Sequence, residues 1–202
     1  MTLLKGKQLV LASKSPRRAE LLRQAGIPFT VRASTFEENL DKGLGPVEYA
    51  RATAVAKGQA VYRSIVAEEN LSSTNIDDEL VVLAADTIVE GLPGHIWEKP
   101  QDAAEARAML LSLSNRSHDV HTGFALISGL GVRSMVVTTS VKFMELEDAS
   151  IDAYVASGSP LDKAGGYGIQ DMWMVDGIVG DYFNVVGLPV SRVLKELRDL
   201  CE

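Results

Sequence analysis

The sequence has a single cysteine, Cys201, which excludes disulfide bonds within the chain and any zinc site built from several thiolates. It also has no run of 18 apolar residues, so we predict no membrane-spanning helix. Residues Met1 to Val10 lack the apolar core and the cleavage site of a signal peptide. We therefore expect a protein of the reducing cytoplasm that does not bind membranes.

Positive charge is also scarce. The 202 residues include 20 Lys and Arg against 27 Asp and Glu, which gives a net charge of −7. Such a chain lacks the basic footprint that neutralises nucleic-acid phosphates, so we predict no nucleic-acid partner. An anionic substrate would need a local basic pocket instead. Hydrophobic residues make up 46% and charged residues 23%, which is the composition of an ordinary globular protein.

Several common catalytic motifs are missing. The sequence contains no Walker phosphate loop, no G-x-G-x-x-G, no G-x-S-x-G and no H-E-x-x-H. His118 and His121 are three positions apart, so on a strand they would face opposite sides and could not share a metal ion. The chemistry must therefore come from other residues.

Helix and strand patterns alternate along the chain, and no linker or repeat divides it. We predict strands at residues 8–12, 28–33, 80–85, 119–128, 132–143 and 172–179, and helices at 16–25, 46–69, 102–113, 151–157 and 188–200. The polar run at 70–79 is typical of an exposed loop. This mixture favours one α/β domain over residues 1–202, with a mixed sheet shared by two lobes.

The segment from Ser13 to Arg18 combines a strand end, a helix start and three cations. Ser15 suits the N-cap and Pro16 the first helical position. Helix N-termini attract anions, and guanidinium groups bind phosphate with two hydrogen bonds. Cations are unfavourable at a helix N-terminus unless an anion lies between them. The segment therefore indicates a phosphate site that includes Ser13, Ser15, Arg17 and Arg18, with a solvated basic turn as the alternative.

Carboxylates supply a second candidate site. Asp86 directly follows the apolar run 80–85, and ligands of open α/β sheets lie at the carboxyl ends of strands. Glu37 and Glu38 follow another predicted strand. Together these oxygens could hold a hard divalent cation. A side chain that only caps the next turn is the alternative for Asp86, and solvated charge is the alternative for the glutamates.

Two lysines and a glycine-rich segment complete the candidates. Lys57 lies in the long predicted helix, and Lys99 lies in a Trp-Glu-Lys-Pro sequence; either alone would usually be a surface lysine. Residues 162–171 carry three glycines beside a tyrosine and Gln170. Glycine allows a ligand to approach the backbone closely, and a glutamine amide can read a base edge. A plain glycine turn is the alternative.

Taken together, these segments resemble the Maf family of nucleotide pyrophosphatases, which is named after septum formation inhibitors. The matches run in the family's order through essentially the whole chain: Leu11–Arg18, Glu20–Leu22, Glu37, Lys57, Ala84–Val89, Glu98–Asp102, His121–Gly123, Asp162–Gln170 and Gly180–Pro189. The resemblance implies an elongated α/β protein of two lobes around a deep cleft, similar to inosine triphosphate pyrophosphatases and usually a homodimer. It also implies a house-cleaning role in which nucleoside triphosphates are cleaved to monophosphate and pyrophosphate with a divalent metal, Mg²⁺ or Mn²⁺.

The resemblance also assigns roles to residues. The catalytic set is Asp86 as general base with Glu37, Lys57 and Lys99, while Glu37 and Asp86 hold the metal. Arg17 and Arg18 neutralise the triphosphate with the two lysines. Family members that carry Ala-Asp-Thr and Gly-Tyr-Gly-Ile-Gln act on dTTP and UTP, so the resemblance predicts these substrates and makes Arg17, Thr87 and Gln170 the specificity residues.

The chain departs from the family pattern at Gly58, where alanine is usual, at Asp171, where glycine is usual, and in a long 70–79 loop. Asp171 would add a negative charge near the pocket that receives the nucleobase. Two other functions stay open at this point. One is a nucleotide-binding regulator of cell division with little turnover, and the other is a phosphomonoesterase.

Overall fold

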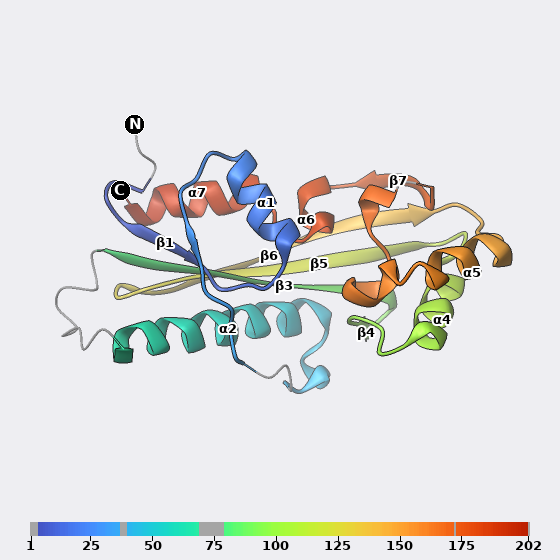
Figure 1. Cartoon of the computed structure of the whole chain (residues 1–202), viewed down its shortest axis with the longest axis horizontal. Helices are drawn as coiled ribbons and strands as arrows, with labels where there is room; N and C mark the ends of the chain where they lie inside the picture. The colour runs from blue at the N-terminus through green and yellow to red at the C-terminus, as the bar shows by residue number, and fades with distance from the viewer. Residues whose placement is uncertain (1–3, 37–39, 69–78, 172, 202) are drawn as a thin grey trace.

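A mixed sheet of seven strands runs along the length of the molecule (Figure 1). The computed structural model describes residues 4–36, 40–68, 79–171 and 173–201. The strand order is β2-β1-β3-β5-β6-β7, with β4 also paired to β3. The strands are β1 (Gln8–Leu11), β2 (Thr30–Val31), β3 (Leu80–Leu92), β4 (His95–Trp97), β5 (Ser117–Ser128), β6 (Gly131–Phe143) and β7 (Val175–Val179). β1 pairs in parallel with β2 and β3, and the remaining pairs are antiparallel.

Helices cover both faces of this sheet and one of its ends. In Figure 1, α1, α6 and α7 lie on one face, α2 lies on the other, and α4 and α5 lie together at the right-hand end. The helices are α1 (Pro16–Gln24), α2 (Pro46–Glu68), α4 (Ala103–Leu113), α5 (Asp148–Ala156), α6 (Tyr182–Val186) and α7 (Val190–Cys201). The predicted α/β class with a mixed sheet and flanking helices is therefore confirmed. Among the described residues, no helix combines the length and the apolar character that crossing a membrane requires.

The core is divided by the sheet. Leu83 and Ala85 of β3 belong to a cluster with α1 and α7, while Val82 and Ala84 belong to a cluster with α2. This alternation is the ordinary two-residue period of a strand buried on both faces. A third cluster packs α4 and α5 against the other end of the sheet.

The long hairpin was predicted well. β5 and β6 are antiparallel from Ser117↔Lys142 to Ser128↔Gly131, and the turn lies at the predicted Gly-Leu-Gly sequence. Residues 129 and 130 form the turn itself, so β6 begins one residue earlier than predicted.

β3 does not end where predicted. We expected the strand to end at Ala85, which would place Asp86 at its carboxyl end, but β3 continues to Leu92. The polar residues at 86 and 87 stay in the strand because β5 pairs with β3 from Val82 to Glu90. What ends near Asp86 is the parallel pairing with β1, whose last register pair is Leu11↔Leu83.

Smaller differences concern short elements. The predicted strand 28–33 is reduced to the two residues of β2, and β7 begins at Val175 rather than at 172. β4 and α6 were not predicted; α6 has only five residues, too few for a periodic pattern, and begins at an Asp181 cap that accepts two backbone N–H groups. Residues 70–78 of the predicted loop and Glu37 and Glu38 lie outside the described residues.

Candidate active site

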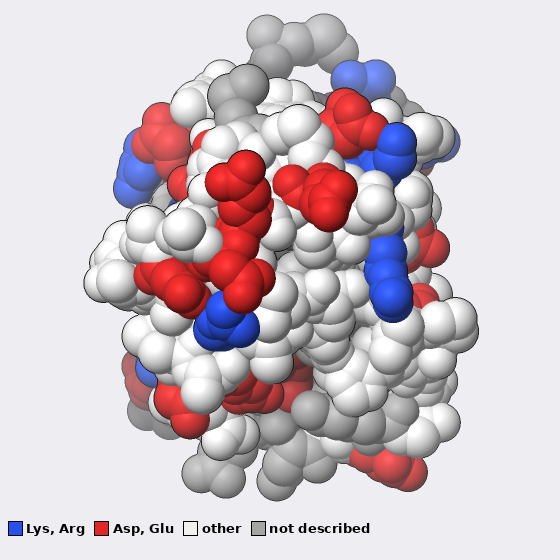
Figure 2. Space-filling view, turned by 90° about the vertical axis from the view of Figure 1, so that its right-hand side faces the viewer, with Lys and Arg blue, Asp and Glu red and all other residues white. Residues whose placement is uncertain are grey.

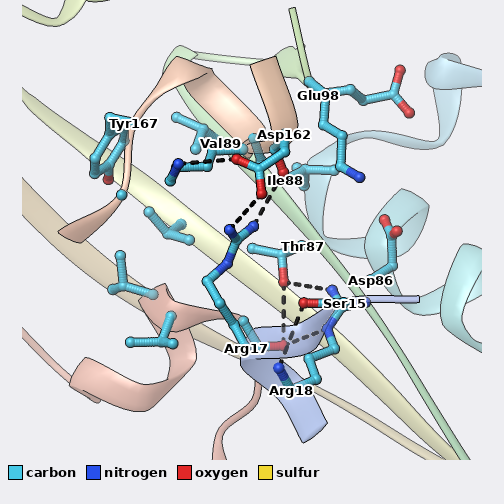
Figure 3. Close-up of a pocket in the computed structure, with 18 of the residues that line it drawn as sticks. Ser15, Arg17, Arg18, Asp86, Thr87, Ile88, Val89, Glu98, Asp162 and Tyr167 are labelled. Carbon is cyan, nitrogen blue, oxygen red and sulfur yellow. Dashed lines mark hydrogen bonds and ion pairs between the residues drawn. The ribbon is translucent and has the colours of Figure 1, made fainter. Parts of the chain in front are cut away.

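A pocket of about 330 Å³ lies beside the middle of β3 (Figure 3). One edge of β3 is paired with β5. On the other edge, which faces the pocket, β1 pairs as far as Leu83 and β4 pairs from Val89, so residues 84–88 have no described strand beside them on that edge. This gap makes both faces of β3 accessible from one pocket. Eight of the ten site residues predicted from the sequence line it: Ser15, Arg17, Arg18, Lys57, Asp86, Thr87, Lys99 and Gln170.

The other two predicted residues are placed differently. Ser13 is buried behind the pocket, where its hydroxyl accepts the N–H of Ser15 at 3.1 Å and an N–H of Arg18 at 3.3 Å. It therefore supports two lining residues instead of lining the pocket. Glu37 lies outside the described residues, so its role at a metal ion stays a prediction.

The first turn of α1 forms one wall. Ser15 is the N-cap, with its hydroxyl accepting the N–H of Arg18 at 3.5 Å, and Pro16 opens the helix as predicted. The first turn contains no acidic residue. The positive end of the helix dipole therefore faces the pocket without an internal counter-charge, which suits an anion.

The guanidinium of Arg18 is held in place by three other segments. Its Nε donates to the carbonyl of Gly187 at 2.8 Å, one terminal nitrogen donates to Thr87 Oγ1 at 3.0 Å, and the other reaches Ser13. Thr87 in turn shares a 2.9 Å hydrogen bond with Thr122, which donates to the carbonyl of Asn184 at 2.8 Å. A cation fixed in this way is oriented before any ligand arrives.

On the α2 side of β3, Asp86 forms a buried ion pair with Lys57. Lys57 Nζ lies 2.6 Å from Asp86 Oδ1, and the two side chains are only 12% and 7% exposed. Asp86 and Thr87 lie on opposite faces of the strand, and therefore contact α2 and α1 respectively. An ion pair shielded from water interacts more strongly than one on the surface.

Gly58 explains how closely α2 approaches the sheet beside Lys57. A Cβ on Gly58 would lie 2.7 Å from Ile127 Cγ1 and 3.3 Å from the Cβ of Ala84. The usual alanine of the family would not fit against an isoleucine in this position. This departure from the family pattern therefore belongs to the packing of α2 on β3 and β5.

Arg17 links the first turn of α1 to the 3-10 turn at Ser159–Asp162. Its guanidinium donates to the carboxylate of Asp162 at 2.8 Å and to the carbonyl of the same residue at 3.1 Å. Lys163 also donates to Asp162, at 2.9 Å. Partial burial raises the pKa of Asp162, but the hydrogen bonds from Lys163 and Arg17 outweigh that effect and hold the pKa below its ordinary value.

Glu98, Asp162 and Lys163 are pocket residues that sequence reasoning did not single out. Glu98 accepts a hydrogen bond from the hydroxyl of Tyr49 at 2.9 Å, and its carbonyl accepts the N–H of Gly165 at 3.0 Å. All three residues lie inside segments that carried the family resemblance, so their position in those segments was the available signal. The neighbouring Lys99 is exposed and lines the pocket.

The three predicted specificity residues differ in how their polar groups are used. Arg17 is bound to Asp162, and the Thr87 hydroxyl is bound to Arg18 and Thr122. Gln170 is exposed, lines the pocket, and has no hydrogen bond from its amide to another described residue. Of the three, Gln170 has the group most available to a ligand.

The pocket is basic although the chain is acidic. Five cationic and three acidic side chains line it: Arg17, Arg18, Lys57, Lys99 and Lys163 against Asp86, Glu98 and Asp162. The whole chain has a net charge of −7, and Figure 2 shows that acidic side chains outnumber basic ones on the end formed by α4 and α5. The local basic pocket that an anionic ligand requires is therefore present.

The sequence profile described as Maf-like protein matches residues 8–200. The chain belongs to the Maf family. Relatives include a protein named dTTP/UTP pyrophosphatase from Salinibacter ruber, 46% identical over 94% of this chain and 89% of the relative. Another of the same name, from Bacillus cytotoxicus, is 44% identical over 95% of each chain.

A solved structure titled nucleoside-triphosphatase / dITP/XTP pyrophosphatase, from Mycobacterium abscessus, matches this Maf protein with a TM-score of 0.38 and 15% identity. That match covers 69% of this chain and 75% of the other.

The pocket of this Maf protein suits a divalent cation by its donor chemistry. The carboxylates of Asp86 and Glu98 both line it, although the described residues contain no group of three or more His, Cys, Asp or Glu side chains placed to hold a metal. Mg²⁺ usually takes one or two carboxylates and completes its shell with water and substrate phosphates. Asp86 and Glu98 therefore offer the oxygen donors that such an ion prefers.

Proposed function

We propose that this Maf protein is a nucleoside triphosphate pyrophosphatase that hydrolyses dTTP and UTP to the monophosphate and pyrophosphate. The observation that carries the proposal is the buried Asp86–Lys57 pair, which lines the same pocket as the cationic start of α1. A reacting carboxylate and a phosphate-binding helix end thus meet in one place. The names of the relatives from Salinibacter ruber and Bacillus cytotoxicus support the same substrates.

Binding of the triphosphate comes first. Arg18, anchored on three sides, and the first turn of α1 receive phosphate oxygens, while Lys99 supplies a further positive charge from the exposed side of the pocket. Phosphoryl-group hydrolysis is mainly a matter of positioning and charge neutralisation, because the phosphorus carries negative oxygens that repel a nucleophile. Asp86 and Glu98, with the predicted Glu37, would hold a divalent cation, Mg²⁺ or Mn²⁺, which would supply further neutralisation.

Asp86 is the general base. The oxygen of a water molecule forms a bond to phosphorus, the bridging bond between the α and β phosphates breaks, and pyrophosphate leaves. Asp86 takes the proton that the water loses. Lys57 donates to this carboxylate at 2.6 Å and so fixes its direction.

Gln170 selects the nucleobase of the substrate. A pyrimidine-2,4-dione presents one N–H donor between two carbonyl acceptors, and a glutamine amide supplies an acceptor and donors to complement that edge. Cytosine presents an amino group and an unprotonated ring nitrogen instead. A mispaired buried polar group costs about 1–3 kcal/mol, so we expect dCTP and CTP to be worse substrates by roughly tenfold or more.

A nucleotide panel with product analysis tests the proposal. With Mg²⁺ or Mn²⁺, dTTP and UTP should give monophosphate and pyrophosphate, and excess EDTA should abolish the reaction. Nucleoside diphosphate with orthophosphate would identify a phosphatase instead. Tight nucleotide binding without turnover would favour the regulator of cell division. Equal kcat/KM for dTTP and dCTP, or a preference for 7-methyl-GTP, would refute the substrate assignment.

The setting of the enzyme is also part of the proposal. We propose a cytoplasmic homodimer whose partner is a nucleotide and not a nucleic acid. The resemblance to the family supports the dimer, the single buried Cys201 suits a reducing compartment, and the acidic end of the molecule would repel nucleic-acid phosphates (Figure 2). Light scattering measures the dimer directly, and a monomeric mass at micromolar concentration would contradict it.

A further inference from the structure

Gln170 lies in a short turn whose two ends are anchored. Ile169 is buried in the core cluster of α1 and α7, and the N–H of Asp171 donates to the carbonyl of Gly168 at 3.0 Å. The backbone therefore turns sharply at Gln170 and points its side chain away from the core. Since the amide of Gln170 is bound to no described residue, its approach to a ligand depends on how firmly this turn is held.

One side chain from a different element holds both ends of the turn. The hydroxyl of Tyr154, in α5, donates to Asp171 Oδ2 and accepts the N–H of Gly168 at 3.3 Å. The ring of Tyr154 packs edge-on against Trp173, with 5.8 Å between the ring centroids. Burial and the hydrogen bond to Asp171 both raise the pKa of Tyr154 above its ordinary value. The hydroxyl consequently stays a donor through the physiological range.

Asp171 is therefore turned toward α5. It is not among the residues that line the pocket, whereas Gly168 and Gln170 on the same turn are. The sequence alone suggested that this carboxylate would place a negative charge near the base. In the structure, Asp171 instead accepts a hydrogen bond from Tyr154, and this bond attaches the end of the turn to α5.

A fixed turn matters because a hydrogen bond forms only within a narrow range of distance and angle. The backbone at residue 170 sets where the Gln170 amide can meet the edge of a pyrimidine-2,4-dione. If the turn were loosened, the correct nucleotide would lose part of this hydrogen bond. A nucleotide that does not form the bond would lose nothing, so selectivity would fall.

We propose that Tyr154 and Asp171 are positioning residues for base selection, which hold the Gly168–Asp171 turn so that Gln170 lies within hydrogen-bond reach of the nucleobase edge. The inference rests on the proposed function, because it takes Gln170 as the residue that reads the base. It adds two residues outside the pocket lining to the determinants of specificity.

The test compares selectivity in four variants. Tyr154→Phe keeps the ring and removes both hydrogen bonds, and Asp171→Ala removes one of them. Both should lower the ratio of kcat/KM for dTTP to that for dCTP by about three- to tenfold, the value of one ordinary hydrogen bond. Asp171→Asn keeps an acceptor for the Tyr154 hydroxyl and should retain the ratio. Tyr182→Phe, an exposed tyrosine in α6, is the matched control and should leave it unchanged.

Binding of the α,β-methylene analogues of dTTP and dCTP, measured by calorimetry, gives the same ratio without turnover. An inactive wild-type protein would refute the proposed function, while the analogue affinities would still decide the inference. An unchanged ratio in Tyr154→Phe and Asp171→Ala would overturn it. So would an equal loss for both nucleotides, because that result indicates a general structural role.

Discussion

A side chain on Gly123 of β5 would begin 2.4 Å from the carbonyl oxygen of Ala50 in α2. Atoms this close overlap, so α2 can cross the sheet at this point only over a glycine. Gly123 is also the register partner of Asp86 on β3, and Lys57 lies two helical turns beyond Ala50. The absence of a side chain at residue 123 thus sets how closely Lys57 approaches Asp86.

Gly123→Ala should therefore lower both stability and activity. The neighbouring atoms belong to the backbone of a buried helix segment and cannot move aside like a flexible side chain, so we expect a loss of about 1–3 kcal/mol in the free energy of unfolding. Urea unfolding and steady-state kinetics measure the two effects. Gly177→Ala in β7 is the matched control, because nothing lies within 4 Å of the new Cβ. Equal stability of the two variants would contradict the close-packing argument.

Asp86→Asn should keep the shape of the site and remove its base. We expect kcat to fall by roughly two to four orders of magnitude, while the melting temperature changes much less, because the asparagine oxygen can still accept from Lys57. Asp199→Asn, an exposed acid in α7, changes the net charge equally and should keep full activity. A folded Asp86→Asn protein with normal turnover would exclude this residue as the base.

The charges of Lys99 and Lys14 separate neutralisation in the pocket from a general effect of charge. Both lysines are exposed, but only Lys99 lines the pocket. Lys99→Ala should lower kcat as well as kcat/KM, by about tenfold or more if it acts on transition-state charge. Lys14→Ala should change either constant only slightly, and less so as salt is added. A rise in KM alone for Lys99→Ala would assign it to uniform substrate binding instead.

Periodic patterns predicted the larger elements because each buries a face of its own. α4, capped by Asp102, and the β5–β6 hairpin were predicted within two residues. β3 was predicted too short because Asp86 and Thr87 look like the end of an apolar strand. They remain in it because each finds a partner on its own face, Lys57 on one and Arg18 on the other. Those partners are distant in sequence, and no local pattern reveals them.

In the site, too, features set by neighbouring residues were predictable and contacts between distant residues were not. The anion character of the α1 start was predictable, since it depends on a cap, a proline and adjacent cations. The contact between Lys57 and Asp86 was not, because it depends on the absence of side chains at Gly58 and Gly123 and on the crossing of α2 over the sheet. The anchoring of Asp171 by Tyr154 likewise requires the position of α5.

The buried His118 predicts how stability depends on pH. Its ring lies between Phe143 and Tyr167, with Nε2 2.7 Å from the Tyr167 hydroxyl, and burial lowers its pKa from 6.5 to about 4. In the unfolded chain the pKa returns to its ordinary value of about 6.5. Between these two values the unfolded chain binds a proton that the folded protein does not. The free energy of unfolding therefore keeps its full His118 contribution above pH 6.5 and loses it as the pH falls toward 4.

The decline attributable to His118 should reach about 3 kcal/mol near pH 4, because a tenfold difference in proton affinity between the folded and unfolded chains corresponds to about 1.4 kcal/mol. Urea unfolding at pH 7 and at pH 4.5 measures it by difference between wild type and His118→Gln, which does not titrate. His95→Gln changes an exposed histidine and serves as the control. Carboxylates also titrate in this range, but they do so equally in all three proteins and cancel in the comparison. If His118→Gln loses as much stability as wild type between the two pH values, the proton is taken up by another group.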